Sequence, residues 1–165
     1  MQWFGRGKEE DPEEFWRRTA EKRGGQIGFL TFATLLGRSE DRPLDLPGLL
    51  YTVGDVVWFE DFERDNWLAR IIGGRRKYDK TELSFARGEV TSSQLVSRSS
   101  AARCIAGVQP VDKLRAVSAM ARIFSTPVVQ VSLANGTTLF FDMIRRAEFI
   151  SQVAGAAPTA PHPAT

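Results

Sequence analysis

The sequence predicts an α+β domain, in which a small antiparallel sheet is bent or closed on itself and carries a helix at each end of the chain. Three stretches support this class: a strand–turn–strand–helix run over 128–150, a second hairpin over 49–59, and a strong helix start at 11–14. The chain has 165 residues, of which 42% are hydrophobic and 10% aromatic, so it can form one domain with an apolar core.

The first helix is predicted to follow an arm formed by residues 1–10. Asp11 can cap it, Pro12 suits its first turn, and Glu14 occupies the capping-box position. The helix should end near Arg23, before Gly24-Gly25. Its half-apolar side carries Phe15, Trp16, Thr19 and Ala20, and we expect it to pack on the sheet or on a partner. We therefore divide the chain into an arm and amphipathic helix at 1–24, a domain at 25–154 and a disordered tail at 155–165.

Strands are expected from the apolar, Phe- and Thr-containing residues 27–36 onward. In the following hairpin, a two-residue loop at Gly54-Asp55 pairs Val53 with Val56 and Tyr51 with Trp58. Further strands are predicted at 67–72, 81–85 and 88–96. Residues 97–110 give no clear pattern, and 112–124 favour a short helix that Asp112 caps.

The terminal hairpin has two alternative registers. A three-residue loop at 134–136 pairs Val131 with Leu139 and Val129 with Phe141, and it places Gly136 in the left-handed region. A two-residue Asn-Gly loop would set the second strand's apolar residues opposite polar ones. We prefer the first register because it gathers the apolar side chains on one face.

A closing helix is predicted after this hairpin, with Asp142 as its cap. Its apolar stripe is formed by Met143, Ala147, Ile150 and Ala154, with Phe149 and Val153 beside it.

The residues that catalysis usually requires are scarce. The single cysteine, Cys104, excludes an internal disulfide and a Cys-rich zinc site, and we interpret it as a small buried hydrophobe. The single histidine, His162, lies in the tail, which argues against a histidine triad and excludes a multi-histidine metal site. No Walker-type phosphate loop and no apolar run of about 18 residues occurs. We therefore expect no catalytic residue, no metal, no cofactor and no nucleic-acid partner.

Charge is distributed unevenly along the chain. Residues 38–66 hold three basic and eight acidic side chains, whereas 67–124 hold eleven basic and four acidic ones. Candidate ligand-binding cations cluster in the second segment: Arg70, Arg75, Arg76, Lys77, Lys80 and Arg87. Such a cluster of cations on a hairpin can bind phosphate or lipid head groups. The alternative is a solvated turn whose charges protect a strand edge.

Two motifs resemble the pleckstrin-homology (PH)-like superfold, in particular its GRAM-type members. "GLLYTVGDVVWFE" is similar to their Gly-x-Leu-Tyr-x-Thr hairpin, and "VVQVSLANGTTLFF" followed by "MIRRAEFISQV" is similar to their last hairpin and capping helix. The resemblance covers about residues 25–154. It implies a small bent β-barrel or sandwich capped by the C-terminal helix, here with an extra N-terminal helix, no catalysis, and binding of lipids, peptides or proteins.

The expected function is therefore a non-enzymatic protein-interaction or adaptor domain in the cytoplasm, with Phe15 and Trp16 as candidate contacts to an unknown protein partner. The alternative is a peripheral module that binds an anionic membrane surface through the basic turn. A homo-oligomer is also compatible with the sequence.

Overall fold

The computed structural model describes residues 12–62, 81–118, 120 and 125–154. Within these residues it has three helices and seven strands. In chain order they are α1 (Pro12–Arg23), β1 (Ile27–Arg38), β2 (Leu46–Val53), β3 (Val56–Asp61), β4 (Glu82–Ala86), β5 (Val90–Ser97), α3 (Arg98–Ile105), β6 (Pro127–Leu133), β7 (Thr138–Met143) and α5 (Arg146–Ala154), with short 3-10 turns η1 (Arg87–Glu89) and η2 (Val111–Lys113).

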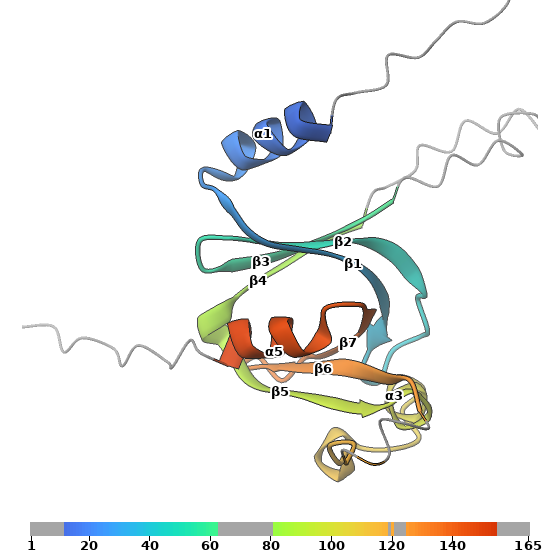
Figure 1. Cartoon of the computed structure of the whole chain (residues 1–165). Helices are drawn as coiled ribbons and strands as arrows, with labels where there is room; N and C mark the ends of the chain where they lie inside the picture. The colour runs from blue at the N-terminus through green and yellow to red at the C-terminus, as the bar shows by residue number, and fades with distance from the viewer. Residues whose placement is uncertain (1–11, 63–80, 119, 121–124, 155–165) are drawn as a thin grey trace, which may run out of the picture.

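The strands form one antiparallel sheet in the order β4-β3-β2-β1-β7-β6-β5. β1 belongs to both halves of this sheet, because Ile27 to Leu35 pair with β2 whereas Ala33 to Arg38 pair with β7. A bulge between Leu35 and Gly37 lies where β1 turns from one half to the other. The sheet therefore folds into two layers, β1–β4 above and β5–β7 below in Figure 1.

The sheet does not close into a barrel, which corrects the barrel form of the predicted fold. Its edge strands, β4 and β5, follow one another through η1 but do not pair with each other. α5 packs against β5, β6 and η1 on this open side, so that a helix fills the space that an edge-to-edge pairing would close. The α+β class with a helix on an antiparallel sheet is confirmed.

Two apolar clusters hold the fold together. The larger one lies between the two layers, and α5 contributes Phe149 and Val153 to it. The smaller one lies on the outer face of the β5–β7 layer, where α3 covers Val128 and Phe140 with Cys104 and Ile105. Burial of these side chains supplies most of the driving force for folding.

Both predicted hairpin registers are confirmed. Tyr51 pairs with Trp58 and Val53 with Val56 across the first hairpin. In the second, Val129 pairs with Phe141 and Val131 with Leu139, and Gly136 has a φ of 85° in the turn. The strand predictions at 27–36, 81–85 and 88–96 correspond to β1, β4 and β5. The strand predicted at 67–72 lies outside the described residues.

Two helix predictions need correction. Asp142 and Met143 end β7, so α5 begins only at Arg146. Phe149 and Val153, predicted beside the stripe, are the buried residues of α5; of the stripe itself Ile150 packs partly on the core, whereas Ala147 and Ala154 are exposed. Asp142 binds arginine side chains and does not cap the helix. The described part of 112–124 holds only η2, because Leu114 is already extended.

Residues 97–110, for which no element was predicted, contain α3. Ser97 caps this helix by accepting a hydrogen bond from the Ser100 amide. The predicted first helix is confirmed as α1, which ends at Arg23 before Gly24, whose φ is 73°.

Candidate functional site

Three large apolar side chains are exposed around one groove of the sheet. Phe32 is 64% exposed, Phe62 40% and Ile144 78%, and all three line a groove of about 280 Å³. The rings of Phe32 and Phe62 lie 6.0 Å apart between centroids. We call these three residues the apolar patch. Exposed large apolar groups that gather at one place mark contact surfaces more often than scattered ones do.

The backbone positions the two aromatic members of the patch, Phe32 in β1 and Phe62 after β3. Phe29, Thr31, Ala33 and Leu35 face the core, and strand alternation therefore places Phe32 on the opposite face. Phe62 directly follows β3, and its backbone amide donates a hydrogen bond of 2.9 Å to the Pro47 carbonyl. Phe32 is thus held within β1 and Phe62 at the end of β3, on either side of β2.

The floor of the groove requires a glycine at position 48. A Cβ atom there would lie 2.2 Å from the Glu60 carbonyl oxygen of β3, far inside any normal contact. Gly48 therefore allows β2 and β3 to approach closely beside Phe62.

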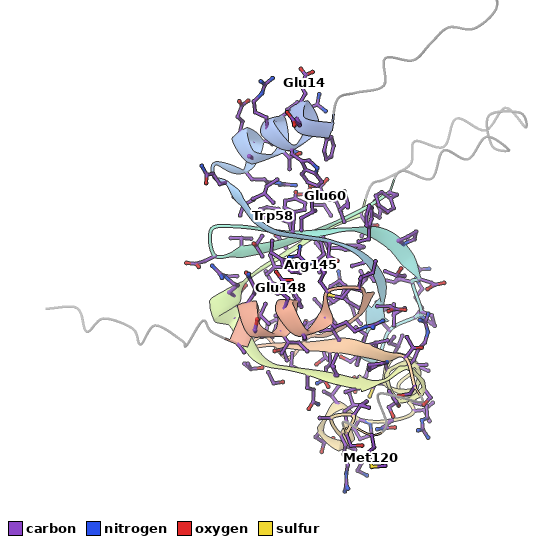
Figure 2. The ribbon with its side chains drawn as sticks, viewed as in Figure 1. Glu14, Trp58, Glu60, Met120, Arg145 and Glu148 are labelled. Carbon is purple, nitrogen blue, oxygen red and sulfur yellow. The ribbon has the colours of Figure 1, made fainter. Side chains whose placement is uncertain are left out.

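Ion pairs fix the third member of the patch. Ile144 lies in the connection from β7 to α5, where Asp142 accepts hydrogen bonds from Arg98 at 2.6 Å and from Arg146 at 2.8 Å. Arg145 donates to the Leu30 carbonyl of β1 at 2.7 Å and pairs with Glu148. Figure 2 shows Arg145 and Glu148 side by side at α5. The charged groups at this rim are therefore already paired within the chain.

A second polar cluster attaches α1 to the outer face of the β1–β4 layer. The Arg23 guanidinium pairs with Glu60 and Glu82 at 2.8 Å each, and it stacks on the Trp58 ring at 3.7 Å. The Tyr51 hydroxyl donates to Glu60 beneath it. Figure 2 shows Trp58 and Glu60 between α1 and the sheet, with Glu14 on the far side of the helix.

The ionisation of this cluster follows from its burial and its pairs. Hydrogen bonding to Arg23 lowers the pKa of Glu82, and the pKa of Arg23 is raised in return. Burial raises the pKa of the Tyr51 hydroxyl well above its usual value, and its hydrogen bond to Glu60 adds to this shift. These shifts keep Arg23 and Glu82 charged and the Tyr51 hydroxyl neutral at neutral pH, which is typical of a structural attachment.

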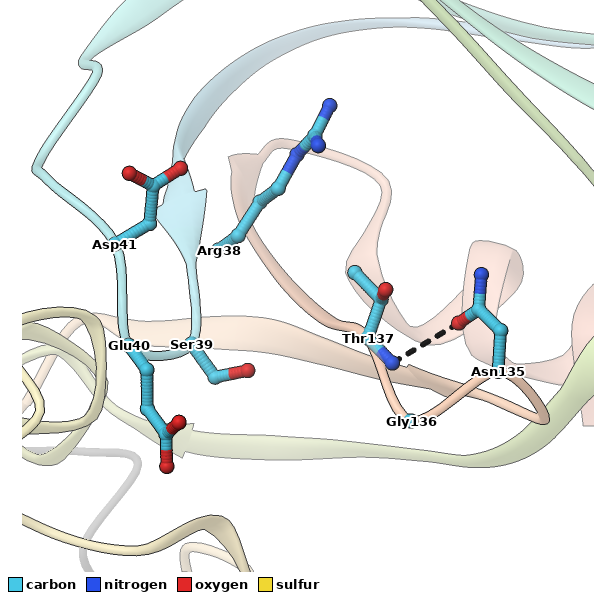
Figure 3. A pocket seen from close by; sticks show the side chains of 7 residues that line it. All are labelled: Arg38, Ser39, Glu40, Asp41, Asn135, Gly136 and Thr137. Atoms are coloured by element: carbon cyan, nitrogen blue, oxygen red, sulfur yellow. Dashed lines mark hydrogen bonds between the residues drawn. The ribbon is translucent and has the colours of Figure 1, made fainter.

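A polar hollow of about 440 Å³ lies between the β1–β2 loop and the β6–β7 turn (Figure 3). Arg38 faces it together with the acidic Glu40 and Asp41. The Asn135 side chain accepts a hydrogen bond from the Thr137 amide at 2.9 Å, which stabilises the turn. Charges of both signs line the hollow, so its chemistry selects no ligand class.

The predicted site residues have different outcomes. Arg70, Arg75, Arg76, Lys77 and Lys80 lie outside the described residues. Arg87 is described in η1, where its guanidinium binds the Gly54 carbonyl at 2.9 Å and Asp55 at 2.7 Å. Arg87 therefore holds the β2–β3 turn.

Phe15 and Trp16, the predicted partner contacts, are half-buried. Their rings meet edge to face at 4.9 Å, and Trp16 contacts Tyr51 of β2 at 6.0 Å. The predicted packing of this helix face on the sheet is thus confirmed, and the side chains are in part committed to it.

The sequence interpretation missed the patch. A signal existed for Phe32, because a large aromatic at an even position of β1 must face away from Phe29 and Leu35. Phe62 and Ile144 lie in connections, where no periodicity predicts the direction of a side chain.

Reactive groups are few among the described residues. The Cys104 thiol is buried, which confirms its interpretation as a core side chain, and desolvation raises its pKa. Residues 12–62, 81–118, 120 and 125–154 hold no group of three or more histidine, cysteine or acidic side chains placed to bind a metal. No helix in the same residues is long and apolar enough to cross a bilayer.

Comparisons of this chain with protein-family models, curated proteins and solved structures found no match.

Proposed function

We propose that this chain is a non-enzymatic, PH-like protein-interaction domain of the cytoplasm, and that it binds a segment of another protein at the apolar patch. The observation that carries the proposal is the exposure of Phe32, Phe62 and Ile144 around one groove. Aromatic and large apolar anchors dominate the binding energy of most protein interfaces.

The chemistry of the groove defines its partner. Asp142 and Arg146 line it, but they pair with each other at 2.8 Å, and Asp142 also pairs with Arg98. A charged ligand group would have to break these pairs and would gain little. The expected partner is therefore a short segment with two or more large apolar side chains, which would lie against the two rings and Ile144.

The order of elements supports the PH-like assignment. A first hairpin, further strands, a terminal hairpin and one closing helix follow each other along the chain, as the family pattern requires. α1 and α3 are additions to that pattern, and the open edge between β4 and β5 departs from a closed barrel.

Selection from a random peptide display library against the full chain tests the proposal. We expect the enriched peptides to share two large apolar residues, and Phe32→Ser to weaken their binding about tenfold or more, equivalent to about 1.4 kcal/mol. Val108→Ser is the matched control, because Val108 is 73% exposed but does not line the groove. Peptides that bind both variants equally would overturn the proposal.

Sedimentation with anionic vesicles tests the membrane alternative on the same protein. The proposal predicts that any binding to vesicles is the same for the natural chain and for Phe32→Ser. Salt-sensitive vesicle binding that is lost on charge reversal of Arg75, Arg76 and Lys77, together with no peptide selected at the patch, would replace the proposal with a membrane function.

A further inference from the structure

The tip of the terminal hairpin places a backbone amide next to a side-chain amide. Asn135 is followed directly by Gly136, and both residues are exposed in the turn between β6 and β7. Because Gly136 has no side chain, its backbone nitrogen can approach the Asn135 Cγ atom without steric hindrance. Asn66, the other asparagine of the sequence, is followed by Trp67, whose bulky side chain hinders the same approach.

Two hydrogen bonds of the turn act on such an approach in opposite directions. The Thr137 amide donates to Asn135 Oδ1 at 2.9 Å, and this is the oxygen on which negative charge develops when Cγ is attacked (Figure 3). The Gly136 amide, which is the nucleophile, donates to the Leu133 carbonyl at 3.0 Å. The native turn therefore activates the carbon that is attacked and restrains the nitrogen that attacks it.

We propose that Asn135 is a site of spontaneous covalent modification, at which its side-chain amide is converted to a carboxylate. The Gly136 nitrogen loses its proton to hydroxide and forms a bond to Asn135 Cγ. The Cγ–Nδ2 bond then breaks, and ammonia leaves with a proton from water, which closes a cyclic imide. Water adds to one of the two imide carbonyl carbons, so that one ring opening gives aspartate and the other gives isoaspartate.

The two products differ in their effect on the hairpin. Aspartate keeps the main chain and retains an oxygen that accepts the Thr137 hydrogen bond. Isoaspartate adds a methylene group to the main chain of a loop that is closed by the Leu133 amide and the Thr137 carbonyl, 2.8 Å apart. The Ala134 amide of the same loop donates to the Glu89 carbonyl of η1 at 2.8 Å. The longer main chain therefore disturbs both the strand register and the contact with η1.

Either product also adds a negative charge to the polar hollow. Arg38 already faces Glu40 and Asp41 there, so the new carboxylate makes the lining more acidic. The hollow and the apolar groove share no lining residue, and the modification does not depend on the proposed function.

Incubation of the purified full chain at mildly alkaline pH, followed by peptide mapping with mass spectrometry, tests the proposal. We expect the peptide with Asn135 to gain the mass of an amide-to-acid change, and the peptide with Asn66 to stay unmodified. Synthetic peptides with aspartate or isoaspartate at this position identify the two products. In guanidinium chloride the reaction should be about tenfold faster, because unfolding breaks the Gly136 hydrogen bond.

Two variants test the mechanism without depending on the native fold. In guanidinium chloride, Gly136→Ala should slow the reaction about tenfold, because the added methyl group hinders the attacking nitrogen. Its φ of 85° in the native turn has no influence there, because the unfolded chain has no turn. Gly88→Ala is the matched control and should leave the rate unchanged.

The effect on the hairpin has a separate measurement. Ion exchange separates the modified protein from the natural chain, and urea unfolding compares their midpoints. We expect a lower midpoint for the isoaspartate form and a nearly unchanged one for Asn135→Asp, which carries the charge without the added methylene group. Equal midpoints for all three proteins would overturn the predicted disturbance of the hairpin.

The other outcomes decide the chemistry. Modification of the unfolded chain alone would overturn the proposal for the native protein, and so would an unmodified Asn135 in both states. Equal rates in the folded and unfolded chain would overturn the restraint by the turn. A reaction at Asn135 that Gly136→Ala does not slow would show direct hydrolysis by water and would overturn the attack by the Gly136 nitrogen.

Discussion

The outer faces of the two layers differ in how far their apolar side chains are covered. On the β5–β7 layer, α3 and the chain after it cover the face, so that Phe140 is 0% exposed and packs with Val128 and Ile105. On the β1–β4 layer, α1 covers Tyr51 and Trp58 but leaves Phe32 64% exposed.

The two faces are covered to different extents. α3, which lies between β5 and β6 in the chain, covers the second layer. Polar side chains on this layer bond one another, since Gln130 bonds Gln94 at 2.8 Å and Ser132 at 3.0 Å. Among the described residues, Arg23 and Trp16 of α1 cover the first layer around Trp58 and Tyr51. The exposed apolar groups beyond them contribute little to stability.

The largest expected effect is a difference in the free energy of unfolding between substitutions of one phenylalanine from each face. Phe140→Ala should lower the free energy of unfolding by about 3–5 kcal/mol, because it leaves a cavity among buried neighbours. Phe32→Ala should change it by no more than about 0.5–1 kcal/mol, because the ring is already exposed. Urea unfolding of both variants measures the difference. Similar losses would show that the Phe32 ring is a core side chain.

The next effect concerns the groove floor. Gly48→Ala should cost about 1–3 kcal/mol, because the new Cβ must displace the β3 backbone at Glu60. Gly88→Ala is the control, since a Cβ there meets nothing within 4 Å. The same urea titration applies, and a Gly48→Ala protein as stable as the control would contradict the close approach.

The smallest effect is the response of the α1 attachment to acid. The pKa of Glu82 is lower in the folded protein than its ordinary value of 4.5, so its pair with Arg23 contributes fully above that value. The contribution is lost as pH falls through the lowered folded pKa. Glu82 is partly exposed, and we expect about 1 kcal/mol or less.

Tryptophan fluorescence against pH follows this attachment, because Trp16 belongs to α1 and contacts Tyr51, and Trp58 lies beneath Arg23 of the same helix. Glu82→Gln should reduce the acid response, whereas Glu14→Gln, on the solvent side of the helix, should leave it unchanged. An identical profile in all three proteins would show that Glu82 does not help to hold α1.

Local chemistry made much of the fold predictable. Turn residues and alternation defined both hairpin registers, and Pro12 with Gly24-Gly25 defined α1. The closing helix was predicted to begin too early because Asp is a common N-cap residue. Asp142 instead forms ion pairs with Arg98 and Arg146, and the folded positions of these two arginines are not readable from the local sequence.

What escaped prediction depends on contacts between distant segments. α3 is short, and its buried side chains, Ala101, Cys104 and Ile105, acquire a partner only when Phe140 and Val128 arrive from later strands. The patch is similar, because nothing local to Ile144 indicates that it will face Phe32 of β1. The basic candidates in 70–80 remain a prediction.

One three-residue turn, η1, is tied to both hairpin tips. The Arg87 amide donates to the Asp55 carbonyl at 2.7 Å, and the Ala134 amide donates to the Glu89 carbonyl at 2.8 Å. The two sheet edges are thus kept at a set separation by main-chain bonds. Neither layer can separate from the other without breaking these hydrogen bonds of η1, so we expect the open sheet to unfold as a single cooperative unit.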